Sequence, residues 1–338
     1  MSSTTPQGAH NLEVVPLRHY GRWLGVVAAV IAVAMVIHTI FSKIPTNTGQ
    51  TVCRVVNGTK TCHPLMVWRF SWDVVGQFFF SREILNGLWL TLQLTAISML
   101  VGIAIGVVVA IMRLSPNRVL SGSAWVYTWF FRGTPVIAQL AFWFNIHLIF
   151  PQLTIGVPFL PITFVHIDTN SLFTPFLAAL VGLALNEGAY MSEIVRSGLI
   201  SVDEGQIEAA TSIGMTRSQT LRLVILPQAM RVTIPPTGNE VISMLKTSSI
   251  ASTVSVLELF GVQGLISGAN YEIVPLLITA SLWYIVVTTV LSIGQFYLER
   301  YFARGSLRNQ PLTPVQRLRR DARGIAAKFR TPRPVMTG

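Results

Sequence analysis

The sequence predicts an all-α, polytopic membrane protein with about six transmembrane helices, and three observations lead to this class. Hydrophobic residues make up 51% of the 338 residues, charged residues only 12%, and the mean hydropathy is +0.56. Apolar runs approaching or exceeding the roughly 20 residues that a membrane-spanning helix needs recur along the chain. Segments of about 10 residues with alternating polarity, which are typical of membrane β-barrels, are missing from the sequence.

The expected spans are the long apolar runs, which cover residues 23–41, 84–112, 124–150, 173–197, 234–260 and 273–298. The first is read as an uncleaved span, because its apolar run is long and no A-x-A cleavage site follows it. The expected organisation is an N-terminal tail (1–22), an extra helix (23–42), a loop (43–83), a helical core (84–300) and a basic tail (301–338).

The distribution of arginine predicts the orientation, because flanking positive charges resist translocation. Arginines precede the first span, lie between the second and third, and recur after the fourth, at Arg18, Arg22, Arg113, Arg118, Arg217, Arg222 and Arg231. The loop 43–83 is also basic, but long loops obey this rule less strictly. We therefore expect a multi-pass protein of the cytoplasmic membrane, with both termini in the cytoplasm.

The formal net charge of +11 lies mostly in the tail beyond Tyr301. Neither repeated aromatic residues nor a nucleic-acid-binding fold accompanies it, so nucleic acid is not an expected partner. We expect a solvated tail that fixes the topology or lies on anionic membrane lipid, with binding of a protein partner as the alternative.

Cys53 and Cys62 are the two cysteines of the chain, within CRVVNGTKTC. Asn57-Gly58 is a strong signal for a two-residue hairpin turn. A hairpin about this turn places the cysteines opposite each other at a non-hydrogen-bonded pair, where the Cα atoms are closest. This geometry suits a disulfide on the oxidising, outer side of the membrane. Free thiols remain the alternative, and a metal site is not expected, because only His63 is adjacent.

Enzyme motifs are not found in the sequence. Lys246-Thr247 superficially matches the end of a nucleotide-binding P-loop, but Met244 and Leu245 precede it instead of a glycine turn. Zinc-protease and serine-hydrolase motifs are missing too. We therefore expect neither ATP binding nor catalysis by this chain.

A polar stretch, EAATSIGMTRSQTLRLVILPQA, follows the fourth span. Its first part, over residues 204–213, favours a helix that Gly214 ends. Thr216 or Ser218 can cap a second short helix, and Pro227 is expected to precede the next span. The stretch therefore predicts two short helices around a glycine turn, exposed on the cytoplasmic side.

Three separated blocks carry a family resemblance. Glu208-Ala209-Ala210, Gly214, Val224, Leu226 and Pro227 have the spacing of the EAA loop, over residues 204–229, of permease subunits in bacterial ATP-binding-cassette (ABC) importers. The blocks RGTPVIAQL, NEGAYMSEIVRSGLISVDEGQIEAA and NEVISMLKTSSIAS resemble the subfamily that imports polar amino acids. The resemblance covers residues 84–298 and implies a type I permease fold with five core helices, to which the first span is an addition.

The resemblance also implies partners and roles. The loop would be a coupling helix docked in a cleft of a separate ATPase present in two copies, and that ATPase would bind the ATP and magnesium. In this reading Glu208 offers charge, Ala209 and Ala210 allow close approach, and Gly214 supplies the turn, with Leu226 and Pro227 completing the motif. A second permease copy or a homologue, and an extracytoplasmic amino-acid-binding protein, complete the expected assembly.

Ionisable residues at membrane depth are candidates for the substrate pathway. Glu187 lies roughly 16 Å from the cytoplasmic end of its span at 1.5 Å per residue, beside Asn186. Glu240 and Lys246 of the fifth span lie on different helix faces, so each is expected to find its partner elsewhere. Two hypotheses stay open: these side chains contact the transported amino acid, or they hold the bundle together.

Two packing expectations concern helix surfaces. Glu193 and Arg196 are spaced to pair at i,i+3, and Gly102 and Gly106 form a small-x-x-x-small pattern typical of closely packed membrane helices.

The alternative to the ABC permease is a secondary transporter or channel-like pore, which would work without an ATPase.

Overall fold

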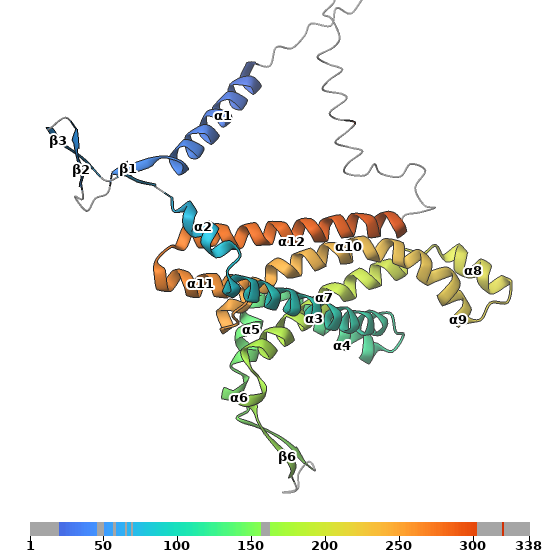
Figure 1. Cartoon of the computed structure of the whole chain (residues 1–338). Helices are drawn as coiled ribbons and strands as arrows, with labels where there is room; N and C mark the ends of the chain where they lie inside the picture. Colours follow the sequence, from blue (N-terminus) through green and yellow to red (C-terminus); the bar gives the residue numbers. More distant parts are fainter. Residues whose placement is uncertain are drawn as a thin grey trace, which may run out of the picture. The chain divides into compact units, whose positions relative to one another are not determined.

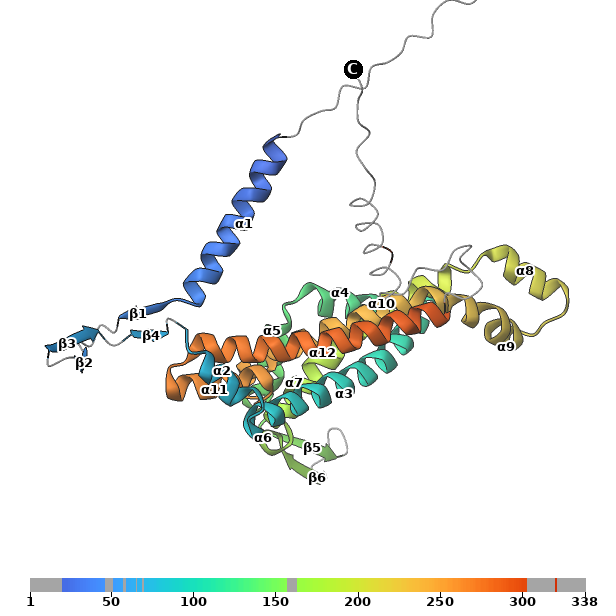
Figure 2. The same ribbon diagram turned by 45° about the horizontal axis from the view of Figure 1, so that its top comes forward.

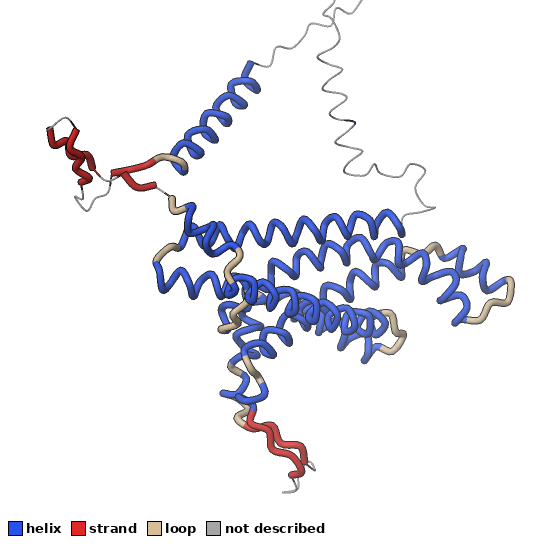
Figure 3. Tube along the Cα trace, viewed as in Figure 1, coloured by secondary structure: helices blue, strands red, loops and turns tan. Residues whose placement is uncertain are grey.

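The structure is a computed structural model that describes residues 20–45, 51–56, 59–64, 66–68, 70–156, 163–302 and 320. It divides into two compact units, Met1–Asp73 and Val74–Gly338. Helices dominate, and strands are confined to the hairpin regions (Figure 3). The tail before residue 20 and nearly all of the basic tail lie outside the described residues.

The first unit contains one long helix followed by short strands (Figure 1): α1 (Tyr20–Ile40), β1 (Lys43–Pro45), β2 (Thr51–Val56), β3 (Thr59–Pro64) and β4 (Met66–Trp68). Strand β1 pairs with β4, and β2 pairs with β3, both antiparallel. In the second pair Val56 is opposite Thr59 and Cys53 is opposite Cys62. The register expected from Asn57-Gly58 is therefore confirmed.

The disulfide between Cys53 and Cys62 stays a prediction. Because the strand register makes these residues direct partners, we expect neither thiol to react with maleimide in protein isolated without reductant, as measured by mass spectrometry. Reduction should expose both, and Cys53→Ser should leave Cys62 reactive. Quantitative labelling of both residues before reduction would contradict the pairing.

The second unit is a helical bundle (Figure 2). Helix α2 (Trp72–Phe79) begins at its boundary, and the elements that follow are α3 (Arg82–Arg113), α4 (Arg118–Gly133), α5 (Val136–Phe144), η1 (Ile146–Leu148), β5 (Gln152–Gly156), β6 (Thr163–Asp168), α6 (Thr169–Leu172), α7 (Pro175–Ile200), α8 (Glu204–Ser212), α9 (Arg217–Thr220), η2 (Leu221–Ile225), α10 (Leu226–Thr247), η3 (Ser248–Val254), α11 (Leu259–Asn270) and α12 (Ile273–Phe302).

The packing of α3 against α7 forms the centre of the bundle. A Cβ atom at Gly102 would lie 2.7 Å from Cγ of Glu187, and one at Gly106 would lie 2.5 Å from Cβ of Met191. Only glycine allows the two backbones this close, so the small-x-x-x-small prediction is confirmed. Around this seam, a core cluster joins side chains from four helices, including Leu94, Leu140, Leu183 and Met244.

Among the described residues, α3 and α12 are long and apolar enough to cross a membrane, and residues 217–254 with α11, bent by 47°, can form a third span. The expected spans over 23–41, 84–112, 173–197 and 273–298 correspond to α1, α3, α7 and α12. Helix α7 has the length of a span but contains Glu187, Glu193 and Arg196.

Two expected spans differ from the structure. The helix expected over 124–150 breaks after Gly133, because Pro135 lacks an N–H and drives Thr134 to an extended backbone, with φ −109° and ψ 143°. Helix α5 ends at Phe144, and a β5–β6 hairpin precedes α6. The span expected over 234–260 begins earlier, at Leu226, and its helix gives way to the 3₁₀ turns of η3 after Thr247.

Candidate functional site

Helices α8 and α9 project from one end of the bundle, beyond α7 and α10, in both views (Figures 1 and 2). Asp203 caps α8, with its Oδ1 accepting from the Gly205 amide at 2.8 Å. Gly214, with φ +80°, ends the helical segment of α8, and the Met215 amide donates a hydrogen bond to the Ala210 carbonyl at 3.1 Å. The predicted helix, glycine turn and second helix are confirmed, and the loop has a defined shape.

Thr216 is the cap of the second helix. It forms a reciprocal capping box with Gln219: the Gln219 amide donates to the Thr216 hydroxyl, and the Thr216 amide donates to Gln219 Oε1 at 2.8 Å. From this cap the helical backbone continues through the π turn η2 into α10. Pro227 therefore lies in the first turn of α10, within a continuous helical segment and not in a loop before it.

The residues expected to contact an ATPase are mostly exposed. Glu208, Ala209, Gly214, Leu226 and Pro227 are accessible, while Ala210 is 4% exposed and packs within the loop. Two apolar side chains of this segment that the motif does not include are also exposed: Ile213 is 78% exposed and Leu223 is 68% exposed. In the sequence, their apolar side chains within an otherwise polar stretch indicate a candidate contact surface.

Asn186 has a structural role at the break between α4 and α5. Because Pro135 has no N–H, the Phe131 carbonyl lacks its normal helical partner. Asn186 Nδ2 donates to this oxygen at 2.8 Å, and Gln139 Nε2 donates to it at 2.9 Å. Asn186 thus satisfies a backbone group at membrane depth, which favours the bundle-holding hypothesis for this residue.

Glu187 has a different environment, against α3. Its side chain is 4% exposed, and Oε1 has no hydrogen-bond partner among the described residues. Glu240 is partly buried and Lys246 is exposed. Within the described part of the chain, no hydrogen bond or ion pair joins either of them to Glu187. Glu240 nevertheless lies close enough to Glu187 for the two carboxyl groups to interact electrostatically.

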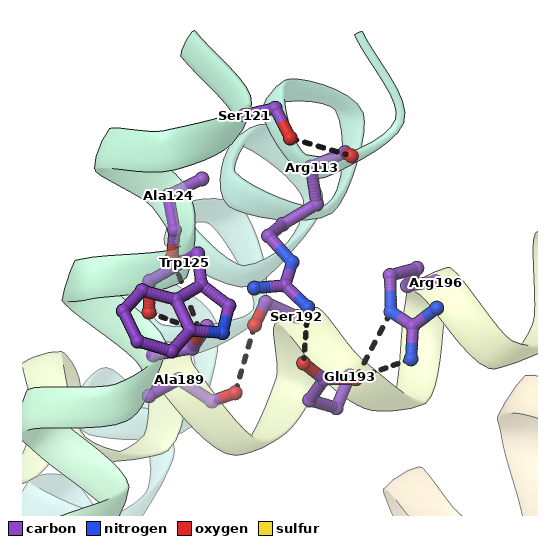
Figure 4. A network of polar contacts seen from close by, with 9 residues as sticks. Arg113, Ser121, Ala124, Trp125, Ala189, Ser192, Glu193 and Arg196 are labelled. Atoms are coloured by element: carbon purple, nitrogen blue, oxygen red, sulfur yellow. Dashed lines mark hydrogen bonds and ion pairs between the residues drawn. The ribbon is translucent and has the colours of Figure 1, made fainter. Parts of the chain in front are cut away.

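Glu193 joins two helices. The expected i,i+3 pair with Arg196 is confirmed, with Nη2 to Oε2 at 2.8 Å. Arg113 at the end of α3 also reaches Glu193, with Nη2 to Oε1 at 3.4 Å (Figure 4). This second contact links positions that are distant in sequence, and no local pattern indicated it.

A buried carboxylate that the sequence analysis missed, Glu258, connects α3, α11 and α12. It is fully buried and accepts hydrogen bonds from the amides of Phe260 and Gly261, at 2.9 and 2.8 Å. The Tyr284 hydroxyl donates to its Oε2 at 3.2 Å, and the Leu259 amide donates to the Thr91 hydroxyl beside it at 3.0 Å. Glu258 is therefore the N-cap that fastens the start of α11 to its neighbours.

Glu258→Ala should lower the free energy of unfolding by about 2 kcal/mol, because it leaves two partly buried amides and a partly buried phenol without their acceptor. The check is the thermal unfolding midpoint of the detergent-purified protein. Glu258→Gln should recover part of the loss, and Glu208→Ala, on an exposed carboxylate, should leave the midpoint unchanged. Equal midpoints for Glu258→Ala and the unmodified protein would contradict the assigned role.

Comparison with known proteins identifies the family. Residues 102–304 match the family model described as "Binding-protein-dependent transport system inner membrane component". The chain belongs to this family. This inner membrane component resembles the arginine transport system permease protein ArgU of Corynebacterium glutamicum. The two are 42% identical over 299 residues, which cover 88% of this chain and 85% of the relative. The chain is 37% identical to the L-cystine transport system permease protein TcyB of Bacillus subtilis, covering 69% and 92%.

The fold of this inner membrane component agrees with that of a solved relative. A chain of the crystal structure of "an amino acid ABC transporter with histidines" superposes with a TM-score of 0.58 and 31% identity, over 68% of this chain and 98% of that one. The all-α ABC permease fold is therefore confirmed, and the alternative of a secondary transporter or channel-like pore is rejected. Membership of the family makes this an integral inner membrane permease subunit that works with a substrate-binding protein and an ATPase.

Proposed function

We propose that this permease carries a polar amino acid into the cell across the cytoplasmic membrane, driven by two copies of a separate ATPase that dock on the α8–α9 loop. The single observation that carries the coupling step is the loop itself. It is capped at both helices, projects from the bundle, and exposes Glu208, Ala209, Ile213 and Leu223. A rigid, partly apolar projection of this kind is suited to docking on a partner.

The remaining assembly follows from the same proposal. A second permease copy or a homologue would complete the pathway, and an extracytoplasmic binding protein would deliver the amino acid. Both termini would lie in the cytoplasm, on the side of α8 and α9. ATP and magnesium would be bound by the ATPase, with no cofactor on this chain.

The relatives' names direct the choice of substrate. They transport arginine, L-cystine and, for another relative, nopaline. L-arginine is therefore the first substrate to test. The permease should be solubilised gently from its native membrane, and the ATPase that co-purifies should be identified by mass spectrometry. The complex should then be reconstituted in vesicles with the binding protein encoded nearby.

ATP-dependent uptake of radiolabelled L-arginine, glutamine or cystine supports the proposal. Uptake that needs an ion gradient and proceeds without ATP contradicts it. Recovery of the permease without any ATPase under several mild conditions also counts against coupling through α8–α9.

Glu187 is the pathway residue that we retain, because its unpartnered, buried oxygen lacks the structural contacts that Asn186 has. Glu187→Gln should raise the KM for L-arginine about tenfold or more, since a hydrogen bond to a charged group contributes about 1.5–3 kcal/mol. Ser197→Ala, which alters an exposed residue near the end of the same helix, serves as the control for general effects on α7. Unchanged uptake kinetics of Glu187→Gln for every amino acid tested would remove the pathway role.

A further inference from the structure

A basic hollow lies where α3 ends, α4 begins and α7 passes. It has a volume of about 420 Å³ and is lined by Arg113, Leu114, Arg118, Ser121, Gly122, Trp125 and Arg196. Three arginines from three helices thus converge on one space. A second hollow of about 330 Å³ adjoins it through Arg113 and Trp125 and adds Arg132.

The positive charge of this hollow is only partly balanced. Glu193 is the acidic partner of both Arg113, at 3.4 Å, and Arg196, at 2.8 Å (Figure 4). Arg118 is exposed and has no ion-pair partner in the part of the chain that the structure describes. Three guanidinium groups against one carboxylate leave an excess of positive charge, which attracts an anion.

Exposed aromatic rings of α4 line the two adjoining hollows, Trp125 both of them and Trp129 the second. Trp125 and Trp129 stack on each other with centroids 6.2 Å apart, and they are 53% and 63% exposed. Tryptophan at this exposure is typical of the boundary between lipid headgroups and acyl chains. Arginines and tryptophans side by side therefore match a ligand with an anionic head and an apolar body.

The position in the fold agrees with this chemistry. Arg113 is the last residue of the apolar helix α3, and Arg118 is the first residue of α4. Helix α7 continues past Arg196 to Ile200 and then to α8, so the hollow lies toward the end of the bundle from which the α8–α9 loop projects. In the orientation of the proposed function, which this step uses, that end faces the cytoplasmic leaflet, where anionic lipids are concentrated.

We propose that this hollow is a binding site for an anionic phospholipid, with the phosphate held by Arg113, Arg118 and Arg196 and the acyl chains along Trp125 and Trp129. The recognised chemistry is a phosphate oxyanion, and the adjacent exposed indoles favour a lipid over free phosphate as its source. Bound lipid would join the ends of three helices next to the coupling loop.

Two variants test the site without disturbing the buried core. Arg118→Gln removes an exposed charge that has no ion-pair partner among the described residues. Gly122→Leu adds a bulky side chain at a residue that lines the hollow, and it does so without a clash, because a Cβ atom at Gly122 meets nothing within 4 Å. Arg82→Gln, which removes an exposed arginine at the other end of α3, is the matched control.

The purified permease complex should be titrated with phosphatidylglycerol, phosphatidylcholine or inorganic phosphate and followed by native mass spectrometry and thermal unfolding. Phosphatidylglycerol should bind and raise the unfolding midpoint. Arg118→Gln should weaken this binding about fivefold, since one arginine near anionic lipid contributes about 1 kcal/mol, and Gly122→Leu should weaken it further. Arg82→Gln should bind as the unmodified protein does.

Equal binding of phosphatidylcholine would overturn the proposal, as would phosphatidylglycerol binding that neither variant weakens. Competition by inorganic phosphate alone, as strong as that by the lipid, would assign the site to a free anion and also overturn it. The readouts need no transport, so failure of the proposed importer function would show separately, as lost ATP-dependent uptake with lipid binding intact.

Discussion

Gly214→Val should abolish ATP-driven uptake while leaving the permease inserted in the membrane. Gly214 has φ +80°, a backbone conformation in which a β-branched residue is strained by about 2 kcal/mol or more. Relief of this strain would break the hydrogen bond that the Met215 amide donates to the Ala210 carbonyl, and it would reorient α8 relative to α9. The surface offered to an ATPase would then lose its shape, although the spans that hold the protein in the bilayer are untouched.

The measurement is uptake of L-arginine together with the amount of ATPase that co-purifies. Gly214→Asn is the matched control, because asparagine tolerates the left-handed conformation better than other non-glycine residues, and it should keep most of the activity. A Cβ at this position meets nothing within 4 Å, so the contrast between valine and asparagine isolates backbone strain from crowding. Normal uptake by Gly214→Val would contradict the role of the turn.

Gly106→Leu should strongly destabilise the protein. Even the first added atom would lie 2.5 Å from Cβ of Met191 and 3.0 Å from its backbone carbon. Helices α3 and α7 would have to separate along the seam that centres the bundle, and overpacking of this kind costs about 3 kcal/mol. We expect little folded protein, and a thermal midpoint well below that of the unmodified permease.

The control for Gly106→Leu is Gly294→Leu in α12, where a Cβ atom meets nothing within 4 Å. Both variants add the same side chain to a membrane-spanning helix, so they share any effect on insertion. Size-exclusion chromatography and thermal unfolding should separate them clearly. Similar midpoints for the two variants would show that α3 and α7 can part without cost, against the close packing described above.

Local chemistry explains which elements could be predicted from the sequence. Asn57-Gly58 fixed the register of β2 and β3, Gly214 fixed the end of the α8 segment, and the spacing of Gly102 and Gly106 fixed the α3 face that meets α7. In each case the determining residues are a few positions apart. Their preferences do not depend on the rest of the fold.

The features that the sequence analysis does not predict are contacts between distant segments and the helix break between α4 and α5. Pro135 was visible in the sequence, but the apolar residues on both sides favoured one span, and the Asn186 amide that satisfies the Phe131 carbonyl comes from another helix. Arg113 with Glu193, and Glu258 with Tyr284, also join separate helices. Such pairs are set by how helices pack, which a single sequence does not show.

The unbroken path from the Thr216 capping box through η2 into α10 has a mechanical consequence. From Arg217 to Thr247 the helical backbone extends roughly 45 Å at 1.5 Å per residue, without a loop to absorb movement. A small tilt imposed at α9 therefore becomes a larger sideways displacement at the far end. Pro235 and Pro236 weaken this rod in its middle, and Gln295 of α12 braces it there by donating to the Pro235 carbonyl at 3.3 Å and to Asn239 Oδ1 at 2.9 Å. The resistance of this segment to bending at its two prolines therefore depends on a side chain of a different helix.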